Sequence, residues 1–433
     1  MIADSQPGAL YDAHLKRVQE DWTLALSRTS YDAAVVFSGQ PPARFLDDQH
    51  YPFHANPHFS AWLPVTDNPG AVLIFAPGEP LRLCLHQPAD YWHAAPAAPA
   101  TWWAKHFQIS VTTEPEQWRQ YLPAGRTAMI GEARYVRATE HLNPVDLITQ
   151  LHLTRTRKSA YEVACIDAAQ HRAARGHRAA AAAFDAGFSE FAIHQAYNEA
   201  SGQLEAELPY PSIIALNEHG AVLHYQFRER ELPEKRRSFL IDAGARCYGY
   251  CSDITRTYTT GEDFGELIAG LDELQQSLCR AVRPGVAFGE LHHLAHVGIA
   301  ELLHEAGIIS QTAATAVDSG LSRVFFPHGL GHFLGIQVHD VAGHLNDDGS
   351  EQPPPPRYPH LRLTRHLQVG NVLTIEPGIY FIDSLLREAA GDFCNDINWA
   401  LVDALRPYGG IRIEDNVVVT DEGSRNLTRE AIA

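Results

Sequence analysis

Four acidic residues that accompany apolar, strand-like runs are the first candidates for chemistry in this sequence. Asp242 ends the run SFLID, Asp253 lies in YGYCSDITRTY, and Glu376 follows VLTI and precedes Pro-Gly. A carboxylate at the inner end of a hydrophobic strand is costly to bury unless it is paired or binds a metal. Two strands joined by a turn would bring Asp242 and Asp253 together. The fourth, Glu414, lies two residues after Arg412, so both side chains share one face of a strand. In isolation, each of these residues also fits a hydrogen-bonded turn or a surface ion pair.

Three histidines lie in or just after a glycine-rich segment. His328 and His332 belong to FPHGLGH, and His339 follows seven residues later. Histidines four apart can share one face of a helix, as in zinc peptidases, but the intervening glycines disfavour a helix. We therefore expect a loop that holds imidazoles beside a site.

Taken together, five of these residues form a possible metal-binding set: Asp242, Asp253, His332, Glu376 and Glu414. Four clustered carboxylates cannot all stay ionised in a buried site, because each raises the pKa of its neighbours, whereas two divalent cations would cancel their charge. An oxygen-rich set with one nitrogen suits Mn²⁺, Co²⁺ or Zn²⁺ and differs from a sulfur-rich structural zinc site. Two metals that share carboxylates also hold a water between them and lower its pKa, which produces a nucleophile at neutral pH.

The order Asp, Asp, His, Glu, Glu within IDAG, SDITRT, HGLGH, TIEPG and GGIRIED resembles the prolidase and aminopeptidase P branch of the metallopeptidases. The resemblance covers roughly residues 160–433, and NEHGAVLHY, EPGIYFIDSLL and FLDDQHYPF make the chain look similar to bacterial prolidases, a group that includes organophosphorus acid anhydrolases. It implies that the five residues bind two metal ions and that the C-terminal half has the pita-bread fold of creatinases and aminopeptidases. Creatinases lack the metal site and methionine aminopeptidases usually lack so large an N-terminal domain, so both fit less well.

The resemblance also implies hydrolysis of the Xaa-Pro bond of dipeptides, with Mn²⁺ as the first candidate metal. A bridging hydroxide would attack the scissile carbonyl, with Glu376 as general base and then general acid. His224, in VLHYQ, and His339 would stabilise the tetrahedral intermediate or orient the substrate, and His328 would line the same pocket. Each of these histidines also fits a hydrogen-bonded core residue.

An arginine is expected to bind the free carboxylate of a dipeptide, since the guanidinium fork can hold both oxygens at once. Arg362, fourteen residues before Glu376, matches the arginine that prolidases are thought to use, and Arg365 is its rival. Arg412 is expected to support Glu414 and the wall of the substrate pocket.

The N-terminal part of one subunit can close the active site of its partner in this family, so the resemblance implies a homodimer. Asp47 and Asp48, in FLDDQHYPF, and Tyr210 are the residues expected near that site. A surface loop is the alternative interpretation of FLDDQHYPF.

Two other functions stay open. The same hydroxide could serve longer Xaa-Pro peptides, as in aminopeptidase P, or organophosphate triesters, because a site that stabilises tetrahedral carbon can also accommodate tetrahedral phosphorus. A catalytically silent relative that only binds proteins is the second alternative, and the intact ligand set argues against it.

Hydrophobic spacing predicts the elements that must position these residues. Helical patterns cover 9–28, 264–281 and 288–306, strand patterns cover 33–37, 71–76, 81–85 and 127–131, and short strand-like runs, AVLHYQF (221–227) among them, dominate after residue 213. The segment 341–369 contains four consecutive prolines and is expected to be a loop. A capping box at Ser159 and Glu162 starts a long helix. We predict an α+β protein with an N-terminal α/β, creatinase-like domain over 1–155 and a pita-bread catalytic domain over 156–433.

Composition excludes several classes of protein. The 433 residues include 34 basic and 52 acidic residues, for a formal charge of −18, which argues against nucleic acid as a partner. Neither a secretory signal nor an apolar run of about 18 residues is found, so we expect no membrane span. The six scattered cysteines are expected to be reduced, in a cytoplasmic protein.

Overall fold

Two compact units make up the computed structural model, which describes residues 5–88, 91–92, 99 and 101–433. The first comprises Met1–Arg155, Ser159–Cys165 and Tyr248–Tyr250, and the second comprises Thr156–Lys158, Ile166–Cys247 and Cys251–Ala433. Within the described ranges, no helix has the length and hydrophobicity needed to cross a membrane.

The first unit contains a six-stranded mixed sheet in the order β4-β3-β2-β1-β5-β6. Its strands are β1 (Ala33–Phe37), β2 (Val72–Phe75), β3 (Arg82–His86), β4 (Gln108–Thr112), β5 (Thr127–Ile130) and β6 (His141–Leu142), and its helices are α1 (Ser5–Arg28), α2 (Pro57–Ser60), α3 (Thr101–Ala104) and α4 (Val145–Arg155). Strands β2 and β3 lie within the predicted strand regions 71–76 and 81–85 to within one residue and pair antiparallel, and β1 runs parallel to β5. The unit is the small α/β domain expected from the sequence.

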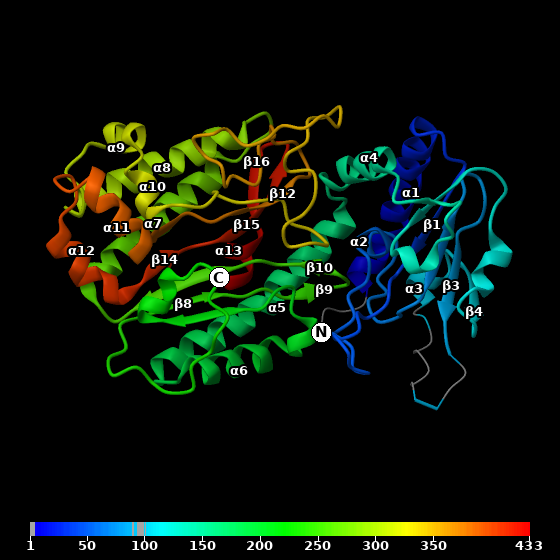
Figure 1. Ribbon diagram of the computed structural model, residues 1–433, viewed down its shortest axis with the longest axis horizontal. Coiled ribbons are helices and arrows are strands. Elements are labelled where there is room, and N and C mark those ends of the chain that lie inside the picture. The colour runs from blue at the N-terminus through cyan, green and yellow to red at the C-terminus, as the bar shows by residue number, and fades with distance from the viewer. Residues whose placement is uncertain (1–4, 89–90, 93–98, 100) are drawn as a thin grey trace. The chain divides into compact units, whose positions relative to one another are not determined.

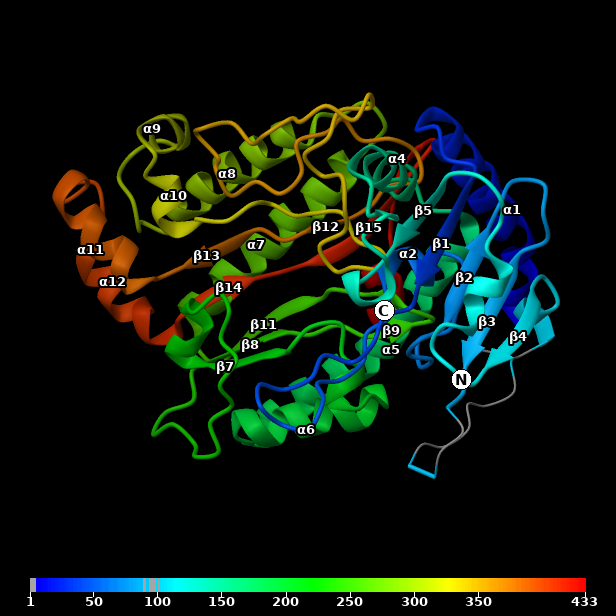
Figure 2. The same cartoon turned by 45° about the vertical axis from the view of Figure 1, so that its right-hand side comes forward.

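The second unit carries the strands that position the candidate residues. These are β7 (Ile213–Leu216), β8 (Ser238–Asp242), β9 (Arg246–Cys247), β10 (Tyr250–Cys251), β11 (Thr255–Thr259), β12 (Val372–Ile375), β13 (Gly378–Tyr380), β14 (Gly410–Arg412), β15 (Asp415–Thr420) and β16 (Gly423–Asn426). They form sheets in the orders β11-β8-β7, β12-β15-β16 and β13-β14. Figure 1 and Figure 2 show these short sheets as one layer in the middle of the unit.

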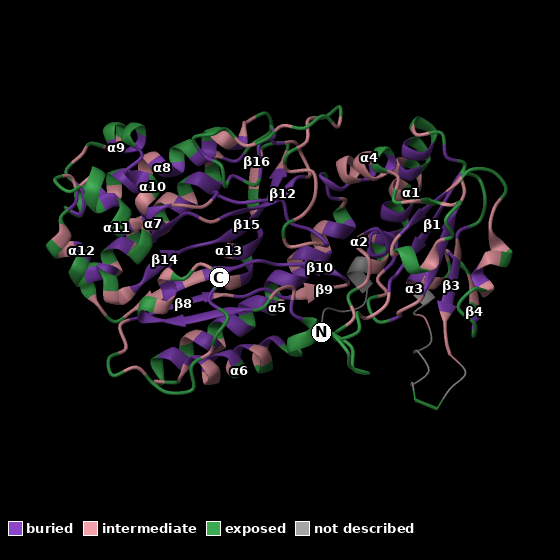
Figure 3. Ribbon diagram, in the orientation of Figure 1, coloured by how far each residue is buried: buried purple, intermediate pink, exposed green. Residues whose placement is uncertain are grey.

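Helices cover both faces of this layer. They are α5 (Ala160–Asp185), α6 (Glu190–Ser201), α7 (Glu262–Ala281), α8 (Phe288–Glu305), α9 (Ala313–Ser319), α10 (Ser322–Phe325), α11 (Asp383–Asp392), α12 (Trp399–Leu405) and α13 (Leu427–Ile432). One hydrophobic core joins α5 and α6 to β7 and β8, and a larger one joins α7 and α8 to β12 and β15. Because both faces are covered, most strand residues are buried: β7, β12, β13 and β14 are buried throughout, whereas β9 and β16 are partly exposed (Figure 3). The predicted helices over 264–281 and 288–306 are confirmed to within two residues.

Two expectations after residue 213 have opposite outcomes. The prediction of a loop over 341–369 is confirmed, since only isolated bridges interrupt it. The prediction of a strand over 221–227 is wrong, because this stretch forms the end of the 3-10 helix Asn217–Ala221 and then turns. Within it the Tyr225 amide donates to the Val222 carbonyl at 3.1 Å and closes a turn, while the Tyr225 hydroxyl donates to the buried carboxylate of Glu190.

Candidate metal centre and cavity

Asp242 and Asp253 are brought together by the antiparallel strands β8 and β11. Asp242 ends β8 and lies opposite Thr255, the first residue of β11, so Asp253 stands two residues before that pair. The chain between them passes so close to itself at Gly244 that a Cβ there would lie 2.0 Å from a backbone carbonyl oxygen. The Tyr210 hydroxyl lies 2.8 Å from Asp242 Oδ1 and 2.5 Å from Asp253 Oδ1. The expected meeting of the two aspartates across a strand pair is confirmed.

Glu414 reaches the same place from the connection between β14 and β15. Its side chain accepts a hydrogen bond at Oε2 from the Thr255 hydroxyl at 2.7 Å, and its backbone amide donates to the Thr255 carbonyl at 3.1 Å. The residue is 1% exposed, and within the described chain its Oε1 atom has no hydrogen-bond partner. A buried carboxylate oxygen without a donor is costly unless a cation satisfies it.

Arg412 is buried beside these carboxylates and forms an ion pair with Asp242, its Nη2 lying 2.6 Å from Oδ2. Its Nε donates to the Thr255 hydroxyl oxygen at 3.2 Å, and that hydroxyl donates in turn to Glu414. Support of Glu414 by Arg412, expected from their spacing, therefore passes through Thr255.

His332 lies in an extended loop that packs directly on β12. At Gly331 a Cβ would lie 2.0 Å from the Thr374 carbonyl oxygen, so only glycine allows this approach. The Thr374 amide then donates to the His332 carbonyl at 2.9 Å, and the His332 amide donates to the Thr374 hydroxyl oxygen at 3.1 Å. The His332 Nδ1 atom lies 2.9 Å from the Phe333 carbonyl and must carry the proton there. With Nδ1 as the donor to that carbonyl, Nε2 is the nitrogen that faces Asp253 Oδ2, at 3.5 Å, and it can bind a cation once it gives up its proton.

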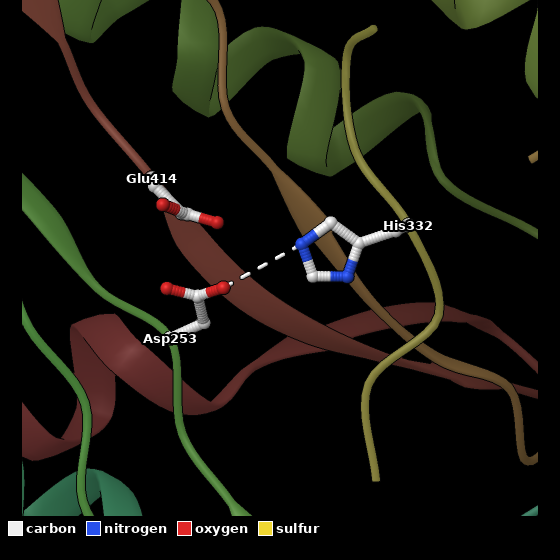
Figure 4. Close-up of side chains that lie close together, drawn as sticks. All are labelled: Asp253, His332 and Glu414. Carbon is white, nitrogen blue, oxygen red and sulfur yellow. Dashed lines mark ion pairs between the residues drawn. The ribbon is translucent and has the colours of Figure 1, made fainter. Parts of the chain in front are cut away.

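Glu376 follows β12, and its amide donates to the Leu330 carbonyl at 2.8 Å. This bond places the Glu376 Oε1 atom 3.7 Å from His332 Nε2. The five predicted ligands thus lie around one point, and all of them line one cavity of about 560 Å³. Potential ligand atoms of Asp253, His332 and Glu414 lie within 4.8 Å of one another, and their side chains point toward a common centre (Figure 4).

Electrostatics at this centre favour positive charge. Burial raises the pKa of Glu414 well above its usual value, and the charges of Asp253 and Glu376 raise it further. Burial also raises the pKa of Asp242, and it raises that of Glu376 to about 7. Carboxylates held in this way gain from any cation that replaces their protons. Together with the unpaired Glu414 oxygen, the donor set fits a divalent metal ion.

The predicted histidines line the same cavity: His224, His328 and His339. The His328 ring is already engaged, its Nδ1 by the Gly329 carbonyl at 2.8 Å and its Nε2 by the Tyr380 hydroxyl at 2.8 Å. Burial and the charge of Arg412 lower the pKa of His328 to about 3, so the ring is neutral. Tyr380 also accepts from Arg412 at 2.9 Å. A chain of contacts therefore runs from His328 through Tyr380 and Arg412 to Asp242.

The two candidate arginines differ in their surroundings. Arg362 is exposed and lines the cavity. Arg365 is buried, its guanidinium bound to the Leu345 carbonyl and to Asp347. Asp48 lies in the first unit, where its side chain is exposed and accepts a hydrogen bond from Gln49 at 3.2 Å.

Some residues that hold the site were not predicted. Asn416 is fully buried, accepts from the Asp253 amide at 2.9 Å and donates to the Asp253 carbonyl at 2.6 Å. Gln170, from α5, donates to the same Asn416 side chain. Tyr380 and Thr255 were likewise missed. Both residues lie in motifs that carry the family resemblance, Tyr380 in EPGIYFIDSLL and Thr255 in SDITRT, but spacing alone cannot show which side chain faces the carboxylates.

Comparisons with known proteins find similarity along nearly the whole chain. Residues 164–421 match the model of Metallopeptidase family M24, and residues 9–153 match that of the Xaa-Pro dipeptidase N-terminal domain. The Xaa-Pro dipeptidase of Stenotrophomonas maltophilia (strain K279a) is 48% identical over 439 residues, covering 100% of this chain and 99% of the relative. The Xaa-Pro dipeptidase of Pseudoalteromonas atlantica is 44% identical, with 98% of this chain and 99% of the relative covered.

Solved structures of Escherichia coli aminopeptidase P share the fold. The zinc-substituted form in complex with product superposes with a TM-score of 0.73 at 22% identity, covering 96% of this chain and 95% of that one. The form with the inhibitor Pro-Leu gives 0.72 at 23% identity with the same coverage. This likeness confirms the expected pita-bread architecture. Since the family model matches more than half of the chain and full-length relatives are 44–48% identical, the chain belongs to metallopeptidase family M24, in its Xaa-Pro dipeptidase branch.

Proposed function

We propose that the cavity hydrolyses the Xaa-Pro bond of dipeptides and that five side chains hold two divalent metal ions, with Mn²⁺ first and Co²⁺ or Zn²⁺ as alternatives. These side chains are Asp242, Asp253, His332, Glu376 and Glu414. When bound, such a pair of cations supplies a hydroxide nucleophile at neutral pH and polarises the scissile carbonyl. The observation that carries the proposal is the buried Glu414 oxygen, which has no hydrogen-bond partner among the residues described, in a cavity lined by four carboxylates.

Glu376 is the group proposed to move the proton. Without bound cations, burial raises the pKa of Glu376 to about 7, so its surroundings accommodate both the carboxylate and the protonated form that a general base and then general acid must adopt in turn. It would accept a proton at its carboxylate oxygens and deliver it to the proline nitrogen that leaves.

The cavity histidines are proposed to contact or support the substrate. Burial and the charge of His332 lower the pKa of His339 to about 3, so its imidazole is neutral and donates through one nitrogen only. His224, which also lines the cavity, would orient the substrate. His328 has both nitrogens engaged, so it would position Tyr380 and Arg412 rather than touch the reacting atoms.

Arg362 is proposed to bind the carboxylate of the dipeptide, because it lines the cavity whereas Arg365 is bound to Asp347. An Arg–carboxylate contact contributes about 1.5–3 kcal/mol, so Arg362→Ala is expected to lower kcat/KM for Ala-Pro by about 10–100-fold, chiefly through KM. Steady-state kinetics measures this change.

The amidated dipeptide Ala-Pro-NH₂ is the matched control, because it lacks the carboxylate. Arg362→Ala should leave its kcat/KM within about twofold of wild type. An equal loss on both substrates would show that Arg362 serves another purpose.

A cytoplasmic homodimer is also proposed, with Asp48 and Tyr210 contributing to substrate binding. Support in the first unit comes from Phe45 and Leu46, which precede Asp48 and are 90% and 91% exposed. Two adjacent apolar side chains this exposed would gain from burial against another protein surface. For Tyr210, support comes from its contacts with Asp242 and Asp253.

A substrate panel tests the proposed function against its alternatives. Rates would be compared on Ala-Pro, a dipeptide without proline, a longer Xaa-Pro peptide and a phosphotriester, before and after chelation. We expect Ala-Pro to be cleaved fastest and cleavage to stop on chelation. A longer peptide cleaved faster than Ala-Pro would favour aminopeptidase P-type action, and a phosphotriester cleaved faster would favour organophosphate hydrolysis.

A further inference from the structure

Glu190 is a buried carboxylate that does not line the cavity, yet it binds both sides of a segment that does. It is the first residue of α6 and is 1% exposed. Its four hydrogen-bond donors are the Leu216 amide (2.8 Å) and His219 Nδ1 (2.7 Å) at Oε1, and the Tyr225 hydroxyl (2.7 Å) and Glu229 amide (2.9 Å) at Oε2. A carboxylate has about four lone-pair sites, so its capacity is filled.

The segment bound in this way carries His224 and Leu223, both of which line the cavity. They occupy the centre of a turn closed by the hydrogen bond from the Tyr225 amide to the Val222 carbonyl at 3.1 Å. The residue after His224 is Tyr225, whose ring stacks on His219 with 4.5 Å between centroids. Glu190 therefore holds a side chain before the turn and a side chain after it.

We propose that Glu190 is a positioning residue for the reaction: its carboxylate fixes the turn that presents Leu223 and His224 to the substrate. The proposal rests on the proposed role of this cavity wall in substrate binding. It also gives a role to the segment NEHGAVLHY, which contains His219 and Tyr225 but none of the five proposed metal ligands.

Glu190→Gln is a conservative test because it keeps the shape of the side chain but replaces one oxygen by an NH₂ group. That group must face either the Leu216 amide or the Glu229 amide, and neither backbone donor can become an acceptor. His219 and Tyr225 could adapt by changing tautomer or rotating the hydroxyl. One backbone amide at an end of the segment therefore loses its acceptor in either orientation.

The expected result is a fall in kcat/KM for Ala-Pro of about 10–100-fold, because small displacements of orienting groups are costly. Metal content, measured by elemental analysis, should match wild type, since no partner of Glu190 is a proposed ligand. Tyr225→Phe removes a single donor and should give a smaller loss of the same kind. Ile299→Ala, in the buried core on α8, controls for lost stability and should retain wild-type kcat/KM below its Tm.

Double-mutant cycles separate positioning from general damage. Glu190→Gln would be combined with His224→Ala and with Leu223→Ala, and each double variant should lose little beyond the worse single variant. Losses that multiply in both cycles, or wild-type kcat/KM in Glu190→Gln, would overturn the proposal. If His224→Ala alone has no effect while the Leu223 cycle shows coupling, the role of Glu190 stands and that of His224 falls.

Discussion

Replacement of Glu376 by glutamine is expected to lower kcat for Ala-Pro by at least about 10²–10⁴-fold, the usual contribution of a positioned general acid or base. Without bound cations, burial raises the pKa of this carboxyl to about 7, so its site accommodates both the charged and the protonated form. The amide keeps one oxygen and the side-chain shape but cannot accept or release a proton. Its backbone stays anchored, since the amide of residue 376 donates to the Leu330 carbonyl in either case.

Glu205→Gln is the matched control for this change. Glu205 is also a carboxylate paired with an imidazole, 2.6 Å from His194 Nε2, but it does not line the cavity. The Glu205→Gln variant should retain the wild-type kcat for Ala-Pro. Circular dichroism and metal analysis would accompany both variants. Near-normal turnover by Glu376→Gln with its metal content intact would refute the proposed proton transfer.

The sequence predicted the positions of the acidic residues because strand ends have a clear local pattern. Asp242 and Glu376 each follow a run of buried apolar residues, and the structure places both at the ends of strands, β8 and β12. The strand pattern also predicted that Asp242 and Asp253 meet, whereas the assignment of all five residues as ligands rested on the resemblance of the whole motif order to a known family. The strand pairing that unites Asp242 with Thr255, 13 positions along the chain, depends on packing between distant segments.

The sequence pattern could not predict the residues that support the candidate ligands through hydrogen bonds. Asn416 and Gln170 are separated by 246 positions, and only the folded chain shows that both hold the backbone around Asp253. The segment 221–227 was predicted as a strand because its apolar residues suit one. Instead, the 3-10 helix Asn217–Ala221 follows β7 directly, and a turn closed by the bond from the Tyr225 amide to the Val222 carbonyl comes next, so the segment is not extended.

Removal of the metal ions is expected to abolish hydrolysis and to lower the Tm, by more at pH 8 than at pH 6. A ligand present at about 100 times its Kd stabilises a protein by about 2.7 kcal/mol, and that support is lost on chelation. The pH dependence follows from the site: without cations, burial raises the pKa of Asp242 and Glu414 and brings that of Glu376 to about 7. A carboxyl whose pKa is raised by folding contributes stability below its unfolded value, near 4, and loses it as pH rises through the folded value.

His332 changes stability in the same direction. Burial lowers its pKa, but the contact with Asp253 and the charge of Glu376 outweigh burial and raise it overall, so its contribution is also lost as pH rises. Asp253, whose pKa is lowered by His332 against the effect of burial, loses its contribution only in acid, outside this window. Bound cations take the place of these protons, so the Tm of the metal-loaded protein should change little between pH 6 and pH 8, whereas the Tm of the chelated protein should fall. Differential scanning calorimetry at both pH values, with Mn²⁺ or with chelator, measures the difference. A gap between loaded and chelated protein that is equal at the two pH values, or larger at pH 6, would mean that these buried carboxyls do not exchange protons for metal.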